Sequence, residues 1–83
     1  MTEQPELLKC LRPSELDCVR LAACGLLDKE IAYRRRVSEQ TVKAQLQAAR
    51  DALGVKNRLQ LSLVYWGVTP EQIEWALNGE ARS

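Results

Sequence analysis

The stretch from Leu26 to Val55 constrains the fold most strongly, because it reads as a short helix, a tight turn and a longer helix. Ser38 can cap the longer helix, since its hydroxyl can accept a hydrogen bond from a backbone N–H of the first turn. Apolar residues then recur at helical spacing on one face: Val42, Leu46, Ala49 and Leu53. The opposite face carries long polar side chains: Lys43, Gln45, Gln47 and Arg50. Such a helix, following closely on another, is the arrangement that reads a DNA major groove.

The remaining spacing predicts an all-α fold of five helices without a sheet, over residues 12–24, 29–36, 39–53, 58–66 and 70–78. Asp28, Asn57 and Thr69 are the predicted caps of the second, fourth and fifth helices. Residues 1–10 are predicted to form an arm, although Leu7, Leu8 and Leu11 could lie on the core. Met1 and this short arm favour a complete small protein.

Composition excludes several classes of protein. With 83 residues, 46% of them hydrophobic and 28% charged, the chain predicts one small folded domain. No apolar run or signal peptide is present, so we expect a cytoplasmic protein without membrane contact. Three cysteines without any histidine argue against a metal site, and Cys18 and Cys24 read as small buried hydrophobes. No catalytic constellation or small-molecule site is evident, so we expect neither an enzyme nor a cofactor.

The charge is concentrated in the middle of the chain. The formal net charge is only +1, yet residues 29–58 hold eight cations against three acids, while residues 1–28 and 59–83 are each net negative by two. The basic excess coincides with the two-helix unit, which is an electrostatic footprint expected for a nucleic-acid-binding surface. A solvated helical face is the alternative reading.

The fourth predicted helix carries more apolar residues than one small core requires: Leu59, Leu61, Leu63, Val64 and Tyr65. An exposed apolar stripe on this helix, and therefore a protein partner, is expected.

Six pieces of the chain resemble, in order and spacing, the LuxR/FixJ-type (GerE-like) helix-turn-helix domain: residues 11–15, 25–26, 29–32, 37–43, 53–55 and 57–58. The resemblance implies a domain over residues 11–68 whose third helix enters the major groove of double-stranded DNA, with an additional C-terminal helix and tail at 69–83. It implies that the fourth helix forms a homodimer interface, for which Leu61, Val64 and Tyr65 are the candidates, although Leu61 and Val64 could both belong to the core. A DNA-binding protein of this bacterial type would associate with the nucleoid.

By family position, the base contacts are Lys43, Ala44 and Gln47. These side chains suit guanine, a thymine methyl and adenine, respectively. The phosphate contacts implied are Lys29, Thr41, Gln45, Lys56, Asn57 and Arg58, with Arg34, Arg36 and Arg50 as additional candidates.

Two positions depart from the family pattern just before the turn. Arg35 stands where an apolar core residue is usual, so its methylenes must pack while the guanidinium reaches water or a carboxylate, or else the helix or turn is displaced. Arg36 stands where glycine is common, which implies either a turn without a strongly positive φ or some strain.

Two function classes remain open. The first is a stand-alone transcription regulator that binds a two-fold DNA site as a homodimer. The second is a protein-binding modulator that pairs with another, LuxR-type, transcription regulator and does not read DNA itself.

Overall fold

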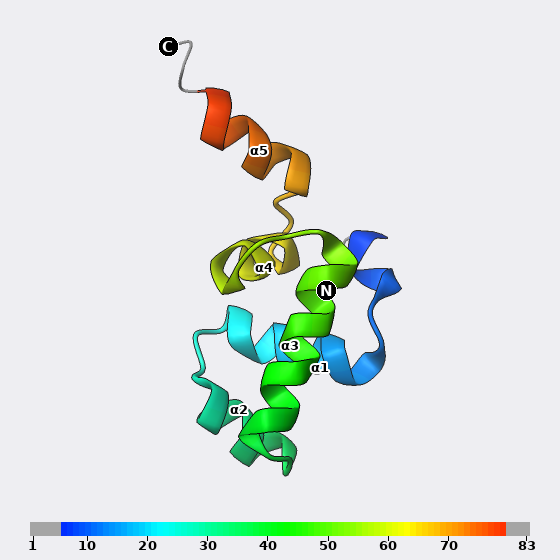
Figure 1. Ribbon diagram of the computed structural model, residues 1–83, viewed down its shortest axis with the longest axis vertical. Helices are drawn as coiled ribbons and strands as arrows, with labels where there is room; N and C mark the ends of the chain where they lie inside the picture. The colour runs from blue at the N-terminus through cyan, green and yellow to red at the C-terminus, as the bar shows by residue number, and fades with distance from the viewer. Residues whose placement is uncertain (1–5, 80–83) are drawn as a thin grey trace.

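The computed structural model describes residues 6–79, and this part of the chain is entirely helical. A short 3-10 helix, η1 (Glu6–Cys10), precedes five α-helices: α1 (Pro13–Ala23), α2 (Asp28–Arg35), α3 (Glu39–Leu53), α4 (Arg58–Tyr65) and α5 (Pro70–Gly79). Helices α1 to α4 form a packed body, and α5 projects from it beyond α4 (Figure 1). The predicted all-α class with an additional C-terminal helix is confirmed.

The core lies where α3 crosses the other helices of the body. The predicted apolar stripe of α3 is buried, with none of its four residues more than 5% exposed: Val42, Leu46, Ala49 and Leu53. Helix α1 packs against α3 and α4, and α2 packs against α3. Because α3 buries its apolar face on this scaffold, its opposite face is left at the surface.

Side-chain caps begin three of the helices as the sequence predicts. The hydroxyl of Ser38 accepts a hydrogen bond from the Thr41 N–H at 3.0 Å, which begins α3. Asn57 Oδ1 accepts from the Gln60 N–H at 2.9 Å, which begins α4. Thr69 exchanges two hydrogen bonds with Gln72 at the start of α5, a capping box. These local signals place the helix starts within a residue.

Three predictions for the N-terminal half need correction or completion. The N-cap of α2 is Leu27, whose N–H donates to Glu30 Oε1 at 2.7 Å; Asp28 is not the cap. Cys18 is fully buried as predicted, but Cys24 is exposed because it lies in the turn that ends α1. Leu8 and Leu11 lie on the core, while residues 1–5 of the predicted arm are outside the described residues.

The turn between α2 and α3 is closed by Arg36 in the left-handed region, at φ 59° and ψ 45°. Of the two readings for this position, the one without a positive φ is therefore wrong. This conformation lets the Arg36 N–H donate to Tyr33 O and the Val37 N–H donate to Ala32 O, which satisfies the last carbonyls of α2. Arg36 is the only non-glycine residue with a positive φ in the described part of the chain.

Candidate nucleic-acid interface

The N-terminal half of α3 presents its polar face to the surface. Lys43, Ala44 and Gln47, the three predicted base readers, are all exposed and lie opposite the buried stripe. The Ser38 cap fixes where α3 starts, and the Ser38 hydroxyl also lies 2.9 Å from Thr41 Oγ1. A helix held on one face and open on the other can enter a groove without unfolding.

A shallow surface hollow of about 380 Å³ brings together cations from three helices. Lys29 at the start of α2, Lys43 on α3 and Arg58 at the start of α4 all line it, together with Leu27, Asp28 and Glu39. Three of the predicted DNA contacts, far apart in sequence, therefore share one surface. Asp28 and Glu39 reduce the positive charge of that surface.

Arg58 has two partners within the protein that the sequence did not reveal. Its guanidinium donates to the Asp28 carboxylate and to the carbonyl of Leu26, both partly buried. These bonds fasten the start of α4 to the start of α2. A phosphate would have to compete with the Asp28 carboxylate for this guanidinium, so the predicted phosphate contact of Arg58 stays a prediction.

Gln47 takes part in a chain of side-chain hydrogen bonds along α3. Its amide donates to Asp51 Oδ1 at 3.0 Å and accepts from the Arg50 guanidinium. Reading adenine would exchange these exposed bonds for bonds to the base, and Arg50 would then be released toward a phosphate.

Gln45 does not lie on the outward face, contrary to the prediction. Its Oε1 accepts a hydrogen bond from the Cys18 thiol at 2.9 Å, so the side chain packs between α3 and α1. The cause is its position beside Leu46 at the border of the buried stripe, where α1 covers it.

Two predicted phosphate contacts precede α4. Asn57 is exposed, but its Oδ1 already accepts the hydrogen bond that caps α4. Lys56, the residue before it, is also exposed.

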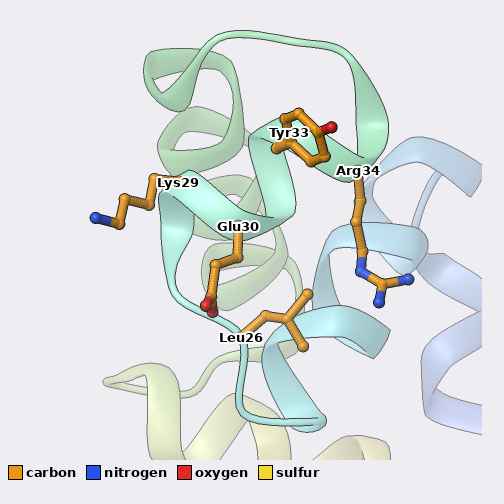
Figure 2. Close-up of a pocket in the computed structure, with 5 residues that line it drawn as sticks. All are labelled: Leu26, Lys29, Glu30, Tyr33 and Arg34. Carbon is orange, nitrogen blue, oxygen red and sulfur yellow. The ribbon is translucent and has the colours of Figure 1, made fainter.

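The outer face of α2 is a second basic surface. A hollow of about 690 Å³ is lined by Leu26, Lys29, Glu30, Tyr33 and Arg34. Figure 2 shows Lys29 and Arg34 extending to opposite sides of α2 with Tyr33 between them. Tyr33 is 86% exposed, and both additional phosphate candidates of this region, Arg34 and Arg36, are exposed.

Two of the three predicted dimer residues are not on the surface. Leu61 and Val64 are 0% and 1% exposed, because this face of α4 packs against α1 and completes the core. Tyr65 is half-buried and makes an edge-to-face contact with Trp66 at 5.0 Å. The exposed apolar residues of this region are instead Leu59, Trp66, Trp75 and Leu77. Of the five apolar residues expected to give α4 an exposed stripe, only Leu59 is exposed; Leu61 and Val64 belong to the core, and Leu63 and Tyr65 are partly buried.

Within residues 6–79, no cluster of three or more His, Cys, Asp or Glu side chains is placed to hold a metal ion. No helix in the described range is long and apolar enough to cross a membrane.

Comparisons with known proteins agree with this geometry. The family described as bacterial regulatory proteins, luxR family, matches residues 9–65. Three proteins named as candidate HTH-type transcriptional regulators, one from Mycobacterium bovis and two from strains of Mycobacterium tuberculosis, are each 45% identical to this chain over 51 residues. The aligned region covers 61% of this chain but only 6% of each relative. No solved structure matches the chain significantly.

Proposed function

The chain belongs to the luxR family of bacterial regulatory proteins, and from this premise we propose that it is a transcription regulator that reads a specific DNA sequence with α3. The observation that carries the proposal is the surface of α3, where Lys43, Ala44 and Gln47 are exposed on a helix whose opposite face is the core. Lys29 borders the same surface and adds positive charge, and Arg58 lines it with its guanidinium paired to Asp28.

Each base reader has a chemical counterpart in the major groove. The Lys43 ammonium donates to guanine O6 and N7, the Gln47 amide pairs with adenine N6 and N7, and the Ala44 methyl touches a thymine methyl. Lys29 lines the same hollow as Lys43, and Thr41, Lys56 and Asn57 are the further proposed phosphate contacts, which would contribute affinity but no sequence information. Arg34, Arg36 and Arg50 extend the positive region.

The test is selection of duplexes from a random pool by the purified chain, at about 50 mM and about 200 mM salt. We expect enrichment of a two-fold motif and a steep loss of affinity as salt rises, because phosphate binding releases counterions. On the selected site, Lys43→Ala should weaken binding by about 1–3 kcal/mol and relax the preference at one position.

Arg20→Ala is the matched control for that variant. Arg20 is an exposed cation of α1, paired with Asp17 at 3.7 Å and outside the proposed contact set, so its removal should leave the selected site and the affinity unchanged. If the wild-type chain enriches no motif and binds no duplex at low salt, the proposal is wrong.

We further propose that the chain acts as a homodimer on two half-sites separated by about one helical turn, roughly 34–36 Å. Leu59 on α4 and Trp66 directly after it are exposed apolar side chains that a second copy would cover. They take the place of Leu61 and Val64, which belong to the core. Such a regulator would act in the cytoplasm, at the nucleoid.

A second candidate function is pairing with another LuxR-type transcription regulator in place of reading DNA. The exposed side chains of Trp75 and Leu77 on α5 favour a protein contact. Salt separates the two functions, because pairing through apolar surface changes little with ionic strength whereas phosphate binding weakens steeply.

A further inference from the structure

A cluster of polar groups joins α1, α2 and α3 beneath the DNA-facing surface. We call it the Arg35 cluster, and its members are Arg35 with Ser14, Asp17, Cys18 and Gln45. The side chain of Arg35 is only 20% exposed. It leaves the last turn of α2 and ends between the two other helices.

The guanidinium of Arg35 has partners on both sides. Its Nη1 donates to the carbonyl of Ser14 on α1 at 2.7 Å, and lies 3.3 Å from the sulfur of Cys18 and 3.4 Å from Gln45 Oε1 on α3. Its Nη2 lies 3.8 Å from the Asp17 carboxylate. The guanidinium is planar and permanently charged, and its N–H donors point in fixed directions, so it can bond to several acceptors at once. A lysine ammonium has no such fixed geometry.

Gln45 is the link between this cluster and the reading surface. Its Oε1 accepts from both Cys18 and Arg35, so its side chain is held against α1. Gln45 also stands directly after Ala44 and two residues from both Lys43 and Gln47. Any rotation or sliding of α3 that moved these three residues would break the bonds of Gln45.

We propose that Arg35 is a positioning residue for sequence discrimination, which fixes the rotation of α3 through Gln45 without touching DNA. The inference rests on the proposed function of α3. Hydrogen bonds to base edges need the helix held in one orientation, whereas long flexible cations reach phosphates from several orientations. Loss of the Arg35 cluster should therefore reduce specific binding and spare non-specific binding.

The experiment compares wild type with Arg35→Met on the duplex selected by wild type and on a scrambled duplex of the same composition. An apolar residue of similar length replaces a partly buried charge, so the variant should fold with a similar or higher melting temperature. We expect about a tenfold loss of affinity for the selected duplex. Affinity for the scrambled duplex and the salt dependence should stay unchanged, because no phosphate contact has been removed.

Two further variants identify the route of the effect. In a Gln45→Met background, Arg35→Met should add little to the loss, because both substitutions remove the same link. Arg35→Lys keeps the charge, so it should fold, yet it should still lose discrimination because a single ammonium cannot replace the fork. The side-chain amide protons of Gln45 should shift in the NMR spectrum of Arg35→Met without any DNA present.

The outcomes separate the two proposals. If wild type selects a motif and Arg35→Met discriminates as well as wild type, or if both duplexes lose affinity equally, Arg35 has no positioning role. A parallel fall in salt dependence would make Arg35 a phosphate contact and also overturn the inference. If wild type selects no motif, the proposed function fails, and the positioning role fails with it even where the Gln45 amide shifts.

Discussion

Replacement of Arg36 by glycine should make the protein more stable. Arg36 holds φ 59° and ψ 45°, whereas the other positive-φ positions of the described chain are glycines: Gly25, Gly54 and Gly67. A residue with a Cβ in this region is strained by about 1–2 kcal/mol. Glycine removes that strain but gives the unfolded chain extra freedom, which costs about 0.5–1 kcal/mol. The net expectation is a gain of about 0.5 kcal/mol.

Thermal unfolding measures this gain. For a domain of this size, 1 kcal/mol corresponds to about 4–8 °C, so Arg36→Gly should raise the melting temperature by about 2–4 °C. Arg36→Ala is the matched control, because it removes the same guanidinium but keeps the strained backbone and should leave the melting temperature near that of wild type. Arg34→Gly, in helical conformation in the last turn of α2, should lower stability by up to about 1 kcal/mol.

If Arg36 contacts a phosphate, Arg36→Gly should lower the affinity for DNA although it raises the stability of the fold. Arg36→Gly and Arg36→Ala should then each reduce the slope of log affinity against log salt by about 0.9. The reasoning about the backbone would be refuted if Arg36→Gly were no more stable than Arg36→Ala. It would then follow that the strain at this turn is no larger than the entropy cost of glycine, about 0.5–1 kcal/mol.

Two further predictions concern α4. Leu61→Ala should lower the free energy of unfolding by about 2–5 kcal/mol in denaturant titrations, because Leu61 is fully buried. The control Leu59→Ala, at an exposed site, should change the free energy of unfolding little. Leu59→Glu should convert a homodimer to monomers of unchanged stability, measured by sedimentation; a dimer that persists would place the contact elsewhere.

The parts of the fold that depend on neighbouring residues could be predicted from the sequence. The caps at Ser38, Asn57 and Thr69 and the buried stripe of α3 each depend on side chains within a few residues of one another. The stripe also indicates which face of α3 is outward. For this reason Lys43, Ala44 and Gln47 were placed correctly at the surface.

Features set by distant parts of the chain could not be predicted in the same way. Helix α4 is apolar on several sides, so its spacing cannot say whether Leu61 or Leu59 meets α1. The bond between Arg58 and Asp28 joins residues 30 positions apart, and no periodicity reports it. Gln45 lies at the edge of the α3 stripe, where only the packing of α1 decides between core and solvent.

The two arginines that depart from the family pattern occupy adjacent positions with different surroundings. Arg35 is held by α1 and α3, which fixes the last turn of α2 in place. Arg36 follows that turn in the left-handed conformation. In this conformation its own N–H and the N–H of Val37 both donate to carbonyls of α2. Arg35 is partly buried and bonded to two other helices, whereas Arg36 is exposed. Arg35→Met should therefore distinguish the selected duplex from the scrambled one less well, with an unchanged slope of log affinity against log salt. Arg36→Gly should reduce that slope and still distinguish the two duplexes.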